Sequence, residues 1–172
     1  SLGGIVLSKL IKTGGFKFDD AIRNVVRREY NLVIGAKTAE RLKISLKELK
    51  QKNEPALIYG RDIISGLPME REVSIAMIED SMKEHFKTII DNVKQILERT
   101  PPELSADIYR NGLYLTGGGS LVSDFGVTLA NGTGLKVNLA QDAEESVIQG
   151  VAEVSKNDRL RSVVYTIDQM EG

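Results

Sequence analysis

The spacing of apolar residues predicts strands and helices in alternation, and one long helix is the clearest element. It begins after Ser74 and ends before Pro101, because a proline disfavours helical backbone at the residue before it. Its apolar residues recur in steps of three and four, which places them on one face. They are Ile75, Ile78, Met82, Phe86, Ile89, Val93 and Ile96. His85 lies at the margin of this face, and we interpret it as a structural residue.

Shorter elements precede this helix. The period-two and helical patterns predict, in order, a strand over residues 4–13, a helix over 18–31, a helix over 38–49 with Thr38 as N-cap, and strands at 56–59 and 71–74. Between these two strands, Ile63-Ile64 in the loop over residues 60–70 could extend the region into a meander. Asp19 and Asp20 fall in the first turn of a predicted helix, where the helix dipole favours acids.

Further strands and helices follow the long helix. We expect a helix over 102–109, a strand ending at Leu115, a helix from Ser120 to about Asn131, a strand over 135–139, and a helix opened by Asp142, Glu144 and Glu145 that runs to about Val154. Residues 157–172 are ambiguous, and Val163-Val164-Tyr165 is either a strand or part of a loose end.

The segment Leu113-Tyr114-Leu115-Thr116-Gly117-Gly118-Gly119-Ser120 is the main candidate for chemistry. Glycines between a strand and a helix let the backbone approach a ligand closely and point N–H groups at it. A helix starting at Ser120 would add its positive dipole end, which suits a nucleotide or another anionic group. A tight turn without a ligand is an equally acceptable interpretation of the glycines alone.

Charge is unevenly distributed, although the net charge is −1. Residues 1–52 hold 12 Lys and Arg against 5 Asp and Glu, and the rest of the chain is acidic. Few aromatic residues accompany the basic ones, so solvated helix faces are a better interpretation than nucleic-acid binding. Glu40, Lys43 and Lys47 share one flank of the second predicted helix, where they are either solvated or within reach of a ligand.

Composition excludes several classes of site. The chain has no cysteine and one histidine, which rules out disulfides, thiol catalysis and zinc sites built from Cys and His. No apolar run has the length of a transmembrane helix and no signal peptide opens the chain, as expected of a cytoplasmic protein. The first residue is not methionine and a strand is predicted almost at once, so we expect an excised piece of a longer protein.

Several motifs in register resemble a known family. The chain is similar to the second lobe of the bacterial actin homologues MreB and Mbl over residues 1 to about 154. The resemblance rests on five stretches: 14–22 (GGFKFDDAI), 39–43 (AERLK), 60–68 (GRDIISGLP), 101–108 (PPELSADI) and 112–120 (GLYLTGGGS).

The resemblance implies an α/β fold of the actin-like ATPase (ribonuclease H-like) class. Residues 1–15 and 74–156 would form the lower subdomain of the second lobe, residues 16–73 a small α+β insertion subdomain above it, and 157–172 a tail. Such proteins clamp ATP and magnesium between two lobes. They self-associate into filaments that direct cell-wall synthesis in rod-shaped bacteria.

Site residues follow from the same resemblance. Glu40 and Lys43 would meet the ribose and adenine side of the nucleotide, with Arg41 close by, and Gly117, Gly118, Gly119 and Ser120 would bracket it. The family's phosphate loops and magnesium-holding groups lie in parts that this sequence does not contain. We therefore predict weak nucleotide binding, no catalytic or metal residue in this chain and no ATP hydrolysis by it.

Partners are also implied by the resemblance. We expect self-association, contact with the cell-wall elongation machinery, membrane contact only through the missing lobe, and no nucleic acid. The full-length protein would be cytoplasmic and membrane-associated.

Other interpretations remain open at this point. A heat-shock chaperone ATPase lobe and the cell-division protein FtsA share the glycine turn, although the small β insert favours MreB. An assembly module with a vestigial nucleotide pocket is the alternative of a different class. A nuclease of the ribonuclease H-like class would need carboxylates on the first predicted strand, which has none.

Overall fold

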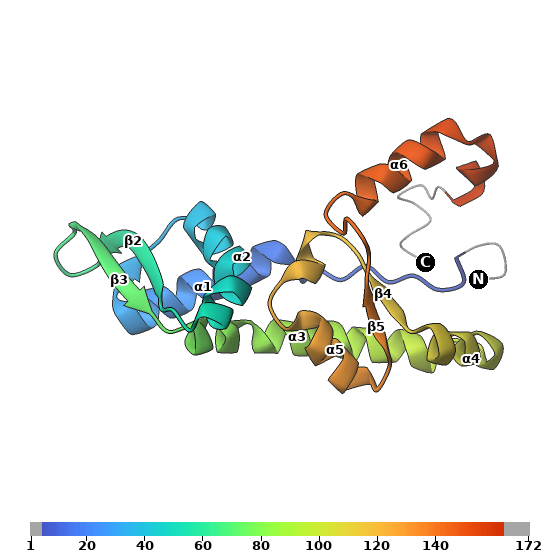
Figure 1. Cartoon of the computed structure of the whole chain (residues 1–172), viewed down its shortest axis with the longest axis horizontal. Coiled ribbons are helices and arrows are strands. Elements are labelled where there is room, and N and C mark those ends of the chain that lie inside the picture. Colours follow the sequence, from blue (N-terminus) through green and yellow to red (C-terminus); the bar gives the residue numbers. More distant parts are fainter. Residues whose placement is uncertain (1–4, 164–172) are drawn as a thin grey trace.

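A computed structural model describes residues 5–163, with the backbone alone for residues 161–163. Helices and strands alternate along the chain, and a long central helix, α3, runs through most of the molecule (Figure 1). The elements are α1 (Gly15–Tyr30), β1 (Leu32–Val33), α2 (Ala36–Lys52), β2 (Ala56–Asp62), β3 (Pro68–Val73), α3 (Ile75–Glu98), α4 (Pro102–Asn111), β4 (Leu113–Leu115), the 3₁₀ helix η1 (Gly118–Leu121), α5 (Phe125–Thr133), β5 (Val137–Leu139), α6 (Ser146–Lys156) and the 3₁₀ helix η2 (Asp158–Val163).

One half of the molecule is an antiparallel sheet packed against α1, α2 and the start of α3. The strands lie in the order β1-β2-β3, and Ala56 of β2 pairs with Val73 of β3. Alternate residues of β2 are buried, as a strand with one face in the core requires. The side chains that fill this core with almost no exposure are Phe18, Ile22, Val26, Leu32, Leu46, Val73, Ile78 and Met82.

The central helix joins this half to the other. Its 24 residues span about 36 Å, and Ser74 caps its start by accepting a hydrogen bond from the Met77 amide. Phe86, near its middle, packs against Phe18 of α1 and Phe125 of α5, with ring centroids 5.2 Å and 5.1 Å apart. A single aromatic cluster therefore links the two halves through α3.

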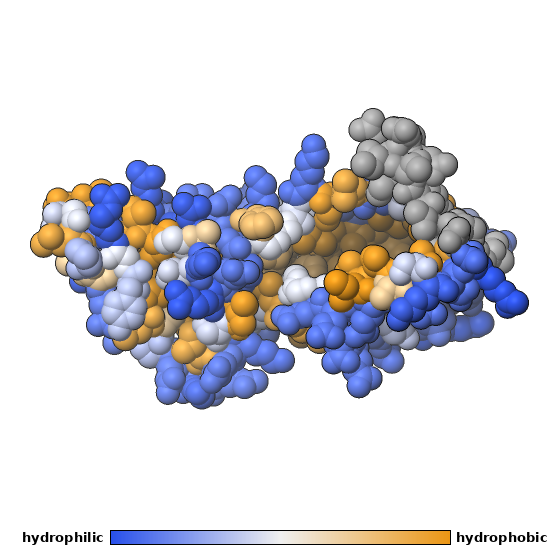
Figure 2. Space-filling view, turned by 90° about the horizontal axis from the view of Figure 1, so that it is seen from above, coloured by the Kyte–Doolittle hydropathy of each residue, from blue (hydrophilic) through white to orange (hydrophobic). Residues whose placement is uncertain are grey.

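The second half carries a small parallel sheet. β4 and β5 pair in parallel register, Leu113 with Val137 and Leu115 with Leu139, and α5 packs on them. α6 lies apart from the central helix (Figure 1) and none of its residues is buried. The space-filling view shows an apolar hollow in this half (Figure 2).

The predicted long helix, the helix over 18–31 and the strand pair around residues 56–74 are confirmed with small shifts of their ends. The predicted strand over residues 4–13 is wrong for the described residues from Ile5 onward, which form no strand. A strand needs a neighbour for its backbone hydrogen bonds, and no described strand pairs with this segment.

Five further features differ from prediction. The helix expected at Ser120 begins at Phe125, and the last helix begins at Ser146 because Asp142 to Glu145 form a turn ahead of it. Gly35, not Thr38, is the N-cap of α2. Ile63-Ile64 lie in the turn between β2 and β3 rather than in a strand, and β1 pairs with β2 although its two residues gave no signal.

The ring of His85 lies 6.1 Å from that of Phe18, a packing contact that agrees with a structural role. Residues 164–172, and with them most of the possible strand at 163–165, lie outside the described residues. The division into subdomains at residues 15, 73 and 156 stays a prediction.

Candidate functional site

The glycine turn follows β4 and is held in place by its own backbone. Gly117 has φ +80°, which favours glycine, and its amide donates to the Ala143 carbonyl at 2.7 Å. Ser120 is buried: its hydroxyl donates to the Gly117 carbonyl at 2.6 Å and its amide to the same oxygen at 3.0 Å. These bonds close the four-residue η1, so the predicted longer helix with its dipole does not start here.

All three glycines of the turn face open space, and Gly117 differs from the other two in its positive φ. A Cβ built on Gly118 or on Gly119 would meet no atom within 4 Å, so packing within the chain does not require a glycine at either position. Among the described residues, neither amide donates a hydrogen bond to a backbone carbonyl. An exposed turn with free N–H groups and no Cβ is what close approach of an anionic ligand needs.

The α2 candidates occupy different environments. Glu40 and Arg41 are exposed, and Arg41 Nε donates to the Lys37 carbonyl at 3.4 Å. Lys43 is buried, with its ammonium 2.7 Å from Asp19 Oδ1 and 3.4 Å from the Gly15 carbonyl. Glu40 therefore projects into solvent, while Lys43 is tied to the start of α1.

Asp19 has a role that sequence reasoning missed. It was expected as an acid favoured by the dipole in the first turn of a helix, but both it and Lys43 keep only about a tenth of their side-chain surface exposed, and the two form an ion pair. Asp19 Oδ1 accepts no hydrogen bond of good geometry, so the nearby ammonium compensates its charge as an ion pair. The signal available in the sequence was that Asp19 follows the apolar Phe18 on the helix face that is buried.

One hollow is lined both by α2 and by the segment that runs from Ser120 to α5, and these two parts are its walls. Lys47 of α2 lines this space of about 410 Å³ together with Ser120, Leu121 and the start of α5. Lys47 shares its helix flank with Glu40 and Lys43 in the sequence, as predicted from a 3.6-residue period. Of the predicted site residues, Ser120 lines this hollow, whereas Glu40, Arg41, Lys43 and the three glycines are not among its lining residues.

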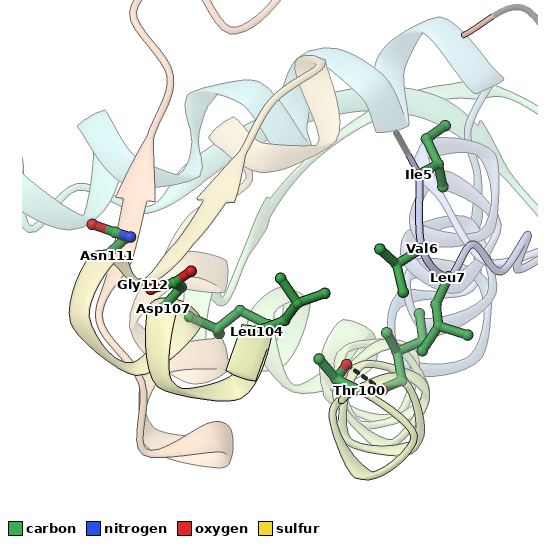
Figure 3. Close-up of a pocket in the computed structure, with 10 residues that line it drawn as sticks. Ile5, Val6, Leu7, Thr100, Leu104, Asp107, Asn111 and Gly112 are labelled. Carbon is green, nitrogen blue, oxygen red and sulfur yellow. Dashed lines mark hydrogen bonds between the residues drawn. The ribbon is translucent and has the colours of Figure 1, made fainter. Parts of the chain in front are cut away.

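A separate apolar hollow of about 360 Å³ lies at the other end of β4 (Figure 3). Ile5, Val6 and Leu7 face Leu104 of α4 and the end of α3 across it, and the Thr100 hydroxyl at its rim donates to the Ile96 carbonyl at 2.8 Å. None of the candidate ligand residues lines it. Among the described residues, no cluster of His, Asp or Glu is arranged to hold a metal ion.

Comparison with known proteins identifies the family. The model of the family described as MreB/Mbl protein matches residues 1–162. This chain belongs to the MreB/Mbl family. It is 40% identical over 163 residues to the cell shape-determining protein Mbl of Bacillus subtilis, covering 93% of this chain and 49% of Mbl. It is 37% identical over 152 residues to MreB of Escherichia coli, covering 87% of this chain and 44% of MreB.

Solved structures of the family share its fold. MreB5 of Spiroplasma citri bound to ADP superposes with a TM-score of 0.83 at 40% identity, covering 91% of this chain and 48% of that one. The AMPPNP-bound form of MreB5 gives a TM-score of 0.80. The chain therefore has an actin-like fold, and it spans about half the length of its MreB/Mbl relatives. No helix in the described part is both long and apolar enough to cross a membrane.

Proposed function

We propose that this chain is the nucleotide-binding second lobe of an MreB-type cytoskeletal protein, which binds ATP, assembles into filaments and controls rod cell shape through cell-wall synthesis. The observation that carries the proposal is the open glycine turn: Gly118 and Gly119 have room where a Cβ would stand and free amides. Family membership supports it, as do the two MreB5 structures, which are bound to ADP and to AMPPNP.

Each candidate residue has a specific part in this proposal. The exposed Glu40 carboxylate accepts hydrogen bonds from ribose hydroxyls, and Arg41 lies at the same rim. An ammonium has three donors; Lys43 donates to the Gly15 carbonyl and forms an ion pair with Asp19, and a remaining N–H is directed to the nucleotide. Gly117 and Ser120 shape the turn, while the amides of Gly118 and Gly119 face the ligand.

Magnesium has no proposed ligand in this chain. The described residues contain no cluster suited to a metal, and the nucleotide's own phosphates are the ligands that magnesium prefers. We therefore assign this lobe to binding the nucleoside part and to supporting the phosphates, and we assign hydrolysis, filament contacts and membrane contact to the complete protein.

An assembly module with a vestigial pocket is the second candidate. It is supported by exposed apolar side chains that lie away from the candidate nucleotide-binding residues, on the β2–β3 turn and on α6. They are Ile63, Ile64, Leu67, Val147, Ile148 and Val151. If assembly is the only role, substitution of Glu40 or Gly118 leaves partner binding unchanged and nucleotide binding is absent from the start.

Calorimetry with ADP, and with ATP and magnesium, tests the proposal. We expect weak binding by the wild-type chain and about a tenfold loss in Glu40→Ala, because one charge-assisted hydrogen bond contributes about 1.5–3 kcal/mol. Glu48→Ala is the matched control, since Glu48 is exposed on the same helix and pairs with Lys52. Binding that responds equally to both substitutions, or no binding by the wild type, overturns the proposal.

A further inference from the structure

Lys50 connects the two walls of the candidate site. It lies in the last turn of α2, one turn beyond Lys47, and its ammonium is 3.1 Å and 3.2 Å from the two carboxylate oxygens of Glu79 on α3. The same ammonium contacts Asp124, the N-cap of α5, even more closely. One side chain thus joins three elements that are far apart in the sequence.

The acidic side of this cluster continues directly from the glycine turn. Asp124 comes three residues after the end of η1, and its φ of +58° is a conformation that residues other than glycine rarely adopt. Ser123 is buried, and its hydroxyl donates to Glu79 Oε1 at 3.2 Å. The segment that leaves the glycine turn is therefore fixed to α3 by Ser123 and to α2 by Asp124.

The basic residues of this cluster belong to α2, which forms the other wall of the hollow. Lys43 and Lys50 are two helical turns apart on α2, a rise of about 10 Å, so a displacement at Lys50 is transmitted to Glu40 and Lys43 through a rigid helix. Between the two walls lies the 410 Å³ hollow bordered by Lys47 and Ser120. The hydrogen bonds that Lys50 donates to Asp124 and then to Glu79 raise the pKa of Lys50, so it stays charged at neutral pH.

We propose that Lys50 is a positioning residue of the nucleotide site: through Glu79 and Asp124 it holds α2 at a fixed separation from the glycine turn. It acts at a distance and does not contact the nucleotide. The inference rests on the proposed function. It differs from a role in folding, because the Lys50 and Asp124 side chains are about half exposed and Glu79 is partly exposed, and loss of an ion pair between exposed groups has little effect on stability.

The first test measures the separation of the walls without any ligand. The chain has no cysteine, so spin labels at Ile44→Cys on α2 and Asn131→Cys on α5, both exposed, report one distance. We expect a narrow distance distribution in the wild type, a broader or shifted one in Lys50→Gln, and recovery in Lys50→Arg. Lys52→Gln is the matched control, because the ion pair of Lys52 with Glu48 lies within α2.

The second test measures ADP affinity in the same variants by calorimetry. We expect Lys50→Gln to bind about fivefold more weakly, the lower end of coupling between sites, and Lys50→Arg and Lys52→Gln to bind as the wild type. Unchanged distances and unchanged affinity in Lys50→Gln overturn the inference and leave the proposed function standing. If the wild type binds no ADP, the proposed function fails, and the distance distribution alone decides whether Lys50 holds α2.

Discussion

Replacing Lys43 by methionine tests whether this residue both stabilises the fold and contributes to nucleotide binding. Methionine keeps most of the apolar stem and removes the ammonium that lies 2.7 Å from Asp19 Oδ1. The carboxylate then stays in a site where about a tenth of its surface reaches water and Oδ1 has no hydrogen bond of good geometry. We therefore expect a large loss of stability as well as a loss of nucleotide binding.

The size of the effect follows from the geometry. At 2.7 Å and an effective dielectric constant of 20, the attraction is on the order of 6 kcal/mol. Most of it offsets the cost of removing two charges from water, so the pair adds little by itself. Removing one partner alone leaves the other uncompensated, which lowers the free energy of unfolding by about 3–5 kcal/mol. This is a large share of the roughly 5–15 kcal/mol that stabilises a domain.

Urea unfolding followed by circular dichroism measures this loss. Lys47→Met is the control, because Lys47 is exposed one turn away on α2, and we expect a change within about 0.5 kcal/mol. The double variant Lys43→Met with Asp19→Asn has no buried charge, so its free energy of unfolding should be about 2 kcal/mol higher than that of Lys43→Met alone. Equal stability of the wild type and Lys43→Met, or a double variant with two additive losses, would refute the ion-pair reasoning.

Two further predictions concern the β1-β2-β3 sheet and its turn. Gly60→Ala places a Cβ 2.6 Å from the Val33 carbonyl oxygen and should destabilise the chain by about 2 kcal/mol. Gly150→Ala in the exposed helix α6 should instead stabilise the chain by up to about 1 kcal/mol. Urea unfolding of both variants measures whether the two changes in stability have opposite signs. Hydrogen bonds from Ser65 and then Ile64 hold the pKa of Asp62 below its ordinary value, so its stabilising effect is complete above about pH 3.9 and disappears as the pH falls through the folded value. Hydrogen exchange at the Ser65 amide, corrected for its intrinsic rate, should accelerate on acidification below about pH 3.9 in the wild type, and a similar step in Asp62→Asn would contradict this.

The long helix was predictable because its signals agree. Ser74 supplies a cap, the apolar residues keep a helical period, and Pro101 ends the element. Residues 5–13 show the limit of such reasoning: an alternating apolar pattern indicates a strand, but strand formation requires a partner, and sequence pattern does not say whether one is present. β1 was missed for the opposite reason: it has a partner strand, but its two residues are too few to show any period in the sequence.

The sequence predicted which type of turn forms the candidate site, but it did not predict the local backbone structure or the contacts of the site residues. The glycine run was recognised as a turn that admits a ligand, and the structure adds that Gly118 and Gly119 combine open space with amides that donate to no backbone carbonyl among the described residues. The helix expected at Ser120 does not form because its hydroxyl bonds back to Gly117 and Asp124 is left-handed. The pairing of Lys43 with Asp19 joins residues 24 positions apart on different helices, a contact that helical periodicity does not reveal.

The unequal burial of the elements has a consequence for how the chain unfolds. The sheet half shares one apolar core with the first turns of α3, whereas α6 has no buried residue and exposes Val147, Ile148 and Val151. Local opening free energies follow buried apolar area, so α6 should open and be cut by proteases well before α1 or β2. Spectroscopic probes in the two regions would then report different transitions, and no single melting temperature would describe the molecule.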